Sequence, residues 1–172
     1  MTSAMNFHPA LFLGLALLGI TSPAREVDQA ATWSAIHLTA QAAIEAGALA
    51  QTQAISPEIR NLGRLVVRDN SELDRRLIAL AANAGIILAI SPKPARTQFA
   101  ELSAVQGTAF DRSFLNFSYG ASQTLRQRMR EAAVQLGRSP LSDLVELFDP
   151  IISQDQFLSA WCLGHCVPKV KP

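Results

Sequence analysis

The chain has 172 residues, of which 49% are hydrophobic and 17% are charged, and its formal net charge is +1. Its length is that of one globular domain, and it is too apolar for an intrinsically disordered chain. Nucleic-acid binding is disfavoured, because fifteen basic residues are balanced by fourteen acidic ones and only 6% of the residues are aromatic. Two cysteines are too few to hold together a disulfide-stapled miniprotein. We therefore expect one domain with an ordinary hydrophobic core.

The amino-terminal segment has the pattern of an export signal. Residues 1–24 contain no Asp, Glu, Lys or Arg, and the eleven-residue apolar run Ala10–Ile20 is followed by Ser22-Pro23-Ala24, a small-x-small cleavage pattern. The run is about half of the roughly 20 apolar residues that a membrane-spanning helix needs, which favours a cleaved signal peptide over an uncleaved anchor. We expect a signal peptide over residues 1–24 and one domain over residues 25–172, exported to the periplasm or cell envelope.

The remaining sequence predicts four long helices. Two of them open with Ser-Pro, at Ser56-Pro57 and Ser139-Pro140, where a serine N-cap precedes a proline at the first helical position. Gly85, Gly137 and Gly164 each follow a periodic apolar run and are expected to end a helix. The predicted helices are Thr32–Gln53, Pro57–Ala84, Ala109–Leu136 and Pro140–Leu163.

The connection between the second and third helices is long. Residues 86–96 contain two prolines, and residues 97–106 are expected to hold a short helix that Gly107 stops. Pro150 is expected to kink the fourth helix. No segment shows sustained period-two alternation or a Gly-rich phosphate loop, which disfavours strands and nucleotide-binding α/β folds. The predicted fold class is all-α, an up-down-up-down four-helix bundle.

One polar residue interrupts each apolar stripe near the middle of its helix. The residues three or four positions away on either side belong to the stripe or border it, so these side chains should face inward. Mid-helix positions of a bundle share one level. The sequence therefore predicts an inward polar layer made of Glu45, Asn70, Ser122 and Asp155.

Such a layer has two interpretations. Two carboxylates, one amide and one hydroxyl could hold a hard divalent cation such as Mg²⁺ or Ca²⁺ weakly, but no imidazole is present for iron, zinc or copper. The favoured interpretation is structural: a hydrogen-bonded layer that fixes helix register, with one carboxyl protonated through burial or paired with a side chain such as Arg68. No resident cofactor is predicted.

Four segments between Ala35 and Trp161 carry a family resemblance. They are Glu45–Ala50 (EAGALA), Leu65–Asn70 (LVVRDN), Leu80–Gly85 (LAANAG) and Phe110-Asp111 ahead of a long helix. In this order and spacing they resemble the bacterial domain-of-unknown-function 4142 family, whose members are described as outer-membrane or periplasmic proteins. The resemblance implies a ferritin-like four-helix bundle.

The resemblance also implies an internal histidine cluster that this chain lacks. The family pattern places a histidine after the aspartate of the second helix, twelve residues after the phenylalanine of Phe-Asp, and five residues after a proline in the fourth helix. These positions are Asn70, Ser122 and Asp155 here. The family's glutamate is retained at Glu45 and its aspartate at Asp69, so the resemblance supports the fold more than any metal chemistry.

Cys162, His165 and Cys166 lie together near the carboxyl terminus. Their spacing does not match a haem-attachment motif, which has two residues between the cysteines and a histidine after them. In an oxidising compartment, a local or intermolecular disulfide between Cys162 and Cys166 is the favoured interpretation. The alternatives are two free thiols without a function and a three-ligand metal site.

These patterns together predict an exported, non-catalytic helical-bundle protein that acts through surface contacts with an unknown protein or a membrane surface. The membrane interpretation depends on a basic bias at Arg126, Arg128, Arg130 and Arg138, which otherwise forms a solvated helix face. The alternative function is a degenerate ferritin-like metal-binding or oxidoreductase domain that uses the polar layer. A third is thiol redox activity at the two cysteines.

Overall fold

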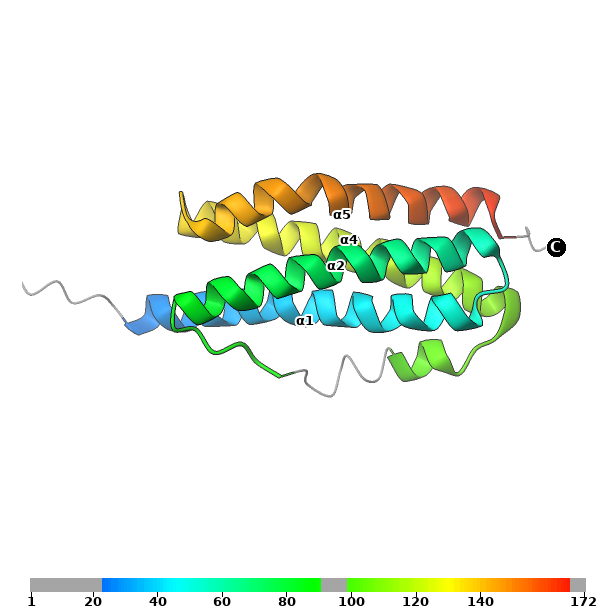
Figure 1. The fold of residues 1–172 in the computed structure, drawn as a ribbon, viewed down its shortest axis with the longest axis horizontal. Helices are drawn as coiled ribbons and strands as arrows, with labels where there is room; N and C mark the ends of the chain where they lie inside the picture. Colours follow the sequence, from blue (N-terminus) through cyan, green and yellow to red (C-terminus); the bar gives the residue numbers. More distant parts are fainter. Residues whose placement is uncertain (1–22, 91–98, 168–172) are drawn as a thin grey trace, which may run out of the picture.

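The chain folds into long helices. The computed structural model describes residues 23–90 and 99–167, with side chains from residue 29 onward, and every regular element in these ranges is helical. Nearly all of the predicted signal peptide lies outside the described residues. Figure 1 shows the four long helices lying side by side, with a short helical segment over residues 99–103 in the connection before the third of them. The long helices are α1 (Pro23–Gln53), α2 (Pro57–Asn83), α4 (Gly107–Leu136) and α5 (Pro140–His165).

The helix ends follow the local signals closely. Ser56 caps α2 by accepting a hydrogen bond from the Ile59 amide, and Ser139 caps α5 in a reciprocal capping box with Ser142. Four predicted boundaries differ. α2 ends at Asn83, one residue before the predicted Ala84, and α4 begins at Gly107, two residues before the predicted Ala109. α1 begins nine residues before the predicted start at Thr32, and α5 continues through Gly164 to His165.

The connection between α2 and α4 runs from one end of the helices to the other. Residues just after α2 lie beside the start of α1, where the Ala89 amide donates to Ser34 Oγ at 3.0 Å. Leu102, in the short helical segment, is buried among residues of the opposite end. The connection therefore crosses the length of the molecule before α4 begins (Figure 1).

This crossover makes the predicted up-down-up-down order wrong. One apolar cluster joins the first half of α1, the last half of α2, the last half of α4 and the first half of α5. α2 and α4 therefore run in the same direction, opposite to α1 and α5, which gives an up-down-down-up order (Figure 1). α1 packs against α2 and α4, and α5 packs against the same two helices, so α2 and α4 lie diagonally opposite each other.

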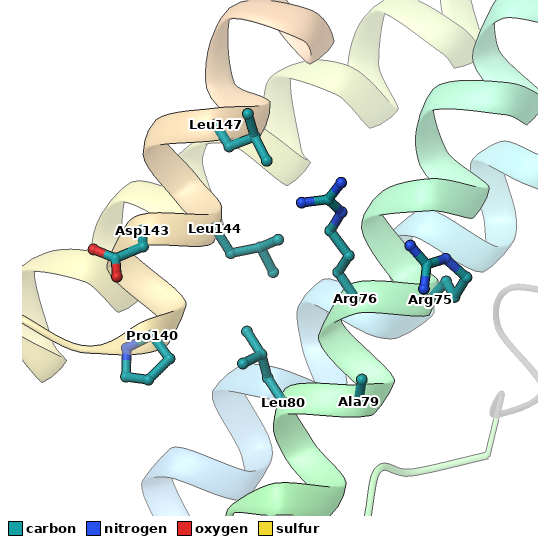
Figure 2. A pocket seen from close by; sticks show the side chains of 8 residues that line it. All are labelled: Arg75, Arg76, Ala79, Leu80, Pro140, Asp143, Leu144 and Leu147. Carbon is teal, nitrogen blue, oxygen red and sulfur yellow. The ribbon is translucent and has the colours of Figure 1, made fainter.

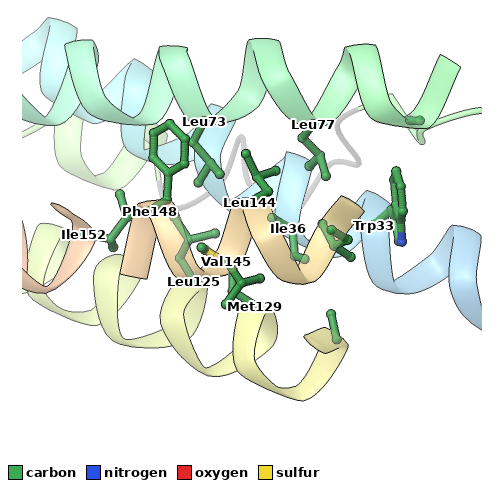
Figure 3. Close-up of a cluster of buried hydrophobic side chains, with 13 residues drawn as sticks. Trp33, Ile36, Leu73, Leu77, Leu125, Met129, Leu144, Val145, Phe148 and Ile152 are labelled. Atoms are coloured by element: carbon green, nitrogen blue, oxygen red, sulfur yellow. The ribbon is translucent and has the colours of Figure 1, made fainter. Parts of the chain in front are cut away.

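The core consists of two apolar clusters. The first apolar cluster, shown in Figure 3, lies where α1 and α5 begin, and large side chains from all four helices fill it. The second lies at the other end and has large buried side chains from α2 and α4, while the buried members from α1 are alanines and Leu49 packs against them partly buried. The first cluster includes Trp33, Ile36, Leu73, Leu77, Leu125, Met129, Leu144, Phe148 and Ile152; the second includes Ala43, Ala46, Ala50, Ile59, Leu62, Val66, Phe110, Phe114, Leu115 and Cys162.

The alanines of α1 belong to a close helix contact. A Cβ atom placed on Gly63 of α2 would lie 2.8 Å from the carbonyl oxygen of Gly47 and 2.9 Å from the Cβ of Ala50. Neither position has room for a side chain. The α1 and α2 backbones approach closely here because small residues face each other, which is why the buried side of α1 is small rather than bulky.

Candidate functional site

A central polar layer separates the two apolar clusters. On α2, α4 and α5, the buried residues between the clusters are all polar, and on α1 the corresponding buried residue is Ala40. Each polar member is at most 9% exposed. The members of the central polar layer are Asp69, Asn70, Ser118, Ser122, Asp155 and Ser159.

Asp155 is the buried acid of this layer. It is 1% exposed, and its Oδ2 atom has no hydrogen-bond partner among the described residues. Burial, together with the nearby Asp69 carboxylate, raises the pKa of Asp155 to about 7, and the more distant Arg68 guanidinium only partly opposes this shift. Asp155 is therefore a carboxyl group that the fold favours in its protonated form.

Asp69 differs from Asp155 because it reaches the edge of the layer. Its carboxylate accepts two hydrogen bonds from Arg68, from Nε at 2.7 Å and from Nη2 at 3.0 Å. The Arg68 side chain is mostly exposed, whereas that of Asp69 is mostly buried. The layer thus contains two carboxyl groups in different settings: Asp155, whose pKa burial raises, and Asp69, which is paired with Arg68.

The uncharged members tie the helices together only in part. Ser159 Oγ donates to the Asp155 backbone carbonyl at 2.8 Å and lies 3.0 Å from Ser118 Oγ on α4. Asn70 Nδ2 donates to the Val66 carbonyl of its own helix at 2.9 Å, while its Oδ1 atom is buried and has no partner among the described residues. The central polar layer therefore holds two unpartnered oxygens, one on α2 and one on α5.

Three of the four residues predicted for the inward layer are buried. Asn70, Ser122 and Asp155 are buried between the two clusters, but Glu45 is exposed, so its predicted inward orientation is wrong. The α1 stripe was assigned from its larger residues, whereas after Ile36 the buried face of α1 consists of alanine and glycine. Ser118 and Ser159 were not predicted as members, although each is four residues from a predicted one.

A second buried polar group joins α1 to α2 within the first half of the core. His37 Nδ1 lies 2.5 Å from Asp74 Oδ1, and Gln41 donates to the other carboxylate oxygen. Asp74 is 3% exposed. Sequence reasoning did not find this pair, although the position of Asp74, four residues after Asn70, places it near the inward face of α2.

Three arginines of α4 form hydrogen bonds with neighbouring helices. Arg126 and Arg130 both donate to the Asp149 carboxylate of α5. Arg128 donates to the Ala35 carbonyl and to the Thr39 hydroxyl of α1, at 2.7 and 2.8 Å. At Arg126 and Arg128 the predicted solvated face is wrong, because these side chains are partly buried against neighbouring helices, whereas Arg130 stays exposed as predicted.

A groove of about 440 Å³ opens between α2 and α5 beside the first apolar cluster. Figure 2 shows Leu80 of α2 opposite Leu144 and Leu147 of α5, with the Arg76 side chain extending from α2 at the edge of the groove. Arg75 and Arg76 both donate to Glu72, and these hydrogen bonds lower the pKa of Glu72 to about 2. We call this feature the α2–α5 groove; it is apolar at its centre and charged at its rim.

Cys162 and Cys166 are both free thiols at the end of α5. Cys162 is buried in the second apolar cluster, and Cys166 is partly exposed. Within residues 23–90 and 99–167, no three His, Cys, Asp or Glu side chains gather into a group that could hold a metal ion. None of the described helices combines the length and hydropathy needed to cross a bilayer.

Comparison with protein families decides the assignment. The family model of a domain of unknown function, DUF4142, matches residues 20–156, which cover most of the chain. The chain belongs to the DUF4142 family. Neither the curated proteins nor the solved structures contain a match to it. In this DUF4142 chain, the three positions at which the resemblance implies histidines are all buried in the central polar layer.

Proposed function

We propose that this DUF4142 protein is exported to the periplasm or cell envelope and acts there without catalysis, by binding a partner protein in the α2–α5 groove. The export step depends on the apolar run and cleavage pattern of residues 1–24. The groove is the observation that supports partner binding. Its occupant would be a protein segment that presents apolar side chains and a carboxylate.

The apolar centre of the groove supplies the driving force. Leu147 on α5 is 46% exposed and Leu80 on α2 is partly exposed, so apolar surface remains in water on both sides of the groove. Covering such surface yields roughly 25 cal/mol for each Å² removed from water. A concave site between two helices suits a protruding segment better than it suits a flat bilayer surface.

The rim supplies specificity. The Arg76 guanidinium donates its Nε hydrogen to Glu72 and lies over the Phe148 ring of α5, 5.7 Å from the ring centre, at the rim of the groove. Arginine recognises carboxylates through paired N–H donors. A partner segment with an acidic residue next to its apolar residues would therefore be selected over a purely apolar one.

Site-specific photocrosslinking in living bacteria tests the proposal. The full chain, with its own leader, carries the photoreactive residue at Leu147 or, as a control, at Val134 of α4, which is 84% exposed. We expect one discrete protein adduct from position 147, none from position 134, and loss of the adduct in Arg76→Glu. No adduct, an adduct with lipid, or an adduct with a second copy would overturn partner binding. Recovery of the chain from the cytoplasm would overturn export.

A specific observation favours a second candidate, weak binding of a divalent cation. Asn70 Oδ1 and Asp155 Oδ2 are buried without partners, and amide and carboxylate oxygens are ligands that Mg²⁺ and Ca²⁺ accept. Asp69 would add a carboxylate, whereas Glu45 is exposed and would not. Elemental analysis of protein purified without chelator or histidine tag tests this candidate. Near one metal per chain, lost in Asp155→Ala and retained in Glu45→Ala, would support it over the structural interpretation.

A further inference from the structure

The last turn of α5 brings two thiols together. Cys162 and Cys166 are four residues apart, a spacing that puts both side chains on one face of a helix. Burial, followed by the hydrogen bond with Cys166, raises the pKa of the Cys162 thiol to about 12. Cys162 is 4% exposed, whereas Cys166 is accessible to solvent in part.

Several contacts hold this turn in its helical form. The Cys166 amide donates to the Cys162 carbonyl at 2.8 Å. The His165 imidazole stacks on Trp161 with ring centres 4.9 Å apart, and its Nδ1 lies 2.8 Å from the Trp161 carbonyl oxygen. Val167, the next residue along the chain, is buried in the second apolar cluster.

A disulfide cannot form while this turn stays helical. Cβ atoms four residues apart on a helix are about 5 to 6 Å from each other. A disulfide needs them about 3.5 to 4.5 Å apart. Gly164 lies between the two cysteines with no heavy atom within 4 Å of where its Cβ would be. Glycine is a poor helix former, so the helix is weakest at this point, and opening it costs mainly the local contacts of His165, Cys166 and Val167.

We propose that Cys162 and Cys166 form a redox site, at which a protein or small-molecule disulfide oxidises both thiols to an intramolecular disulfide as the last turn of α5 opens. The proposal depends on the proposed export, which supplies an oxidising compartment. Its consequence is a carboxyl-terminal cap with two forms: a helical dithiol form and an opened disulfide form.

The exchange proceeds in two steps. The more exposed Cys166 sulfur, as a thiolate, attacks one sulfur of the oxidant to form a mixed disulfide, and the released thiolate takes up the proton that Cys166 lost. The Cys162 sulfur then attacks Cys166, which breaks the mixed disulfide and releases the second thiol with the proton from Cys162. Two thiols and one disulfide become one disulfide and two thiols, and two electrons pass to the oxidant.

Redox titration of the purified full chain in glutathione buffers tests the site. Acid quenching, thiol labelling and intact mass count free thiols and separate an internal disulfide from a dimer or a glutathione adduct. We expect an internal disulfide in the wild type, accompanied by loss of about one turn of helix in the far-ultraviolet circular dichroism. Cys162→Ser should give only the glutathione adduct. Thiols that stay free, or a disulfide-linked dimer, would overturn the proposal.

Two glycine variants test whether the disulfide forms only when the last turn of α5 opens. Gly164→Ala strengthens the helical turn and should shift the equilibrium toward the dithiol about fivefold. Gly120→Ala is the matched control, because Gly120 lies in α4 and also has no atom near its Cβ position. An equal equilibrium constant in wild type and Gly164→Ala would show that the turn does not open. These measurements use purified protein, so their failure would leave the export and groove proposals standing, and failed crosslinking would leave the redox result standing.

Discussion

The two halves of the core differ in the size of the side chains that α1 contributes. In the first apolar cluster α1 contributes Trp33 and Ile36, and large side chains from four helices meet. In the second, the buried members from α1 are alanines, and the α1 backbone approaches that of α2 where Gly47 faces Gly63. The central polar layer lies between them. The first half should therefore be sensitive to loss of volume, and the second to both loss and gain of volume.

Loss of a large side chain should have the greatest effect. Phe148→Ala in the first cluster and Phe114→Ala in the second should each lower the free energy of unfolding by about 3 to 5 kcal/mol, because both side chains are at most 2% exposed. Urea denaturation measures the change, and Val134→Ala, at a position 84% exposed, is the control. A cost below about 1 kcal/mol at Phe114 would mean that the second cluster is not packed as described.

The central polar layer should make stability depend on pH. The folded pKa of Asp155 is about 7, above its ordinary value of 3.8, so the folded state binds this proton more tightly than the unfolded state does. Its stabilising contribution is fully present below about pH 4 and is lost as pH rises through 7. Three pKa units correspond to a total loss of about 4 kcal/mol.

Asp155→Asn should remove this dependence and make the protein more stable than wild type at pH 8. Denaturant unfolding at pH 5 and pH 8 measures how the free energy of unfolding changes with pH in wild type and in Asp155→Asn. Glu45→Gln, at an exposed position, is the control. If wild type and Asp155→Asn lose the same stability over this range, Asp155 is not the titrating group.

Gain of volume should matter only in the second half. Gly63→Ala places a methyl group 2.8 Å from the Gly47 carbonyl oxygen and should cost about 1 to 2 kcal/mol, the overpacking penalty less the gain in helix propensity. Gly120→Ala has no such neighbour and should stabilise by about 0.5 to 1 kcal/mol. Thermal denaturation distinguishes the opposite signs. Stabilisation by Gly63→Ala would show that the helices are not in close contact here.

The smallest expected effect concerns the two short loops. Ser139→Ala removes the capping box of α5 at the end where the first cluster lies, and should cost about 1 kcal/mol. The loop at the other end is held differently, because the buried Asp111 carboxylate of α4 accepts hydrogen bonds from the Ile55 and Ser56 amides. Amide hydrogen exchange should show faster opening of the first turn of α5 in Ser139→Ala and no change at Ser56.

Local sequence signals predicted those features that depend only on neighbouring residues. The Ser-Pro starts of α2 and α5 were predicted to the residue, because capping and proline geometry involve only neighbouring positions. Asn70, Ser122 and Asp155 were predicted to be buried because helical spacing relates each to apolar residues of its own helix. Glu45 was placed wrongly, since α1 buries small residues against α2, and a pattern based on side-chain size does not show this.

The sequence by itself determined the helical class, most helix ends, the family and three members of the central polar layer. Only the tertiary structure decided the order of the helices. The connection of residues 84–106 is long enough, at up to about 3.3 Å per residue, to cross the length of α2 or to fold back at one end. Contacts between residues distant in sequence favour the first path, because Leu102 is buried in the second cluster while residues after α2 lie beside α1. The same long-range packing placed Asp69 beside Asp155 and Asp74 beside His37.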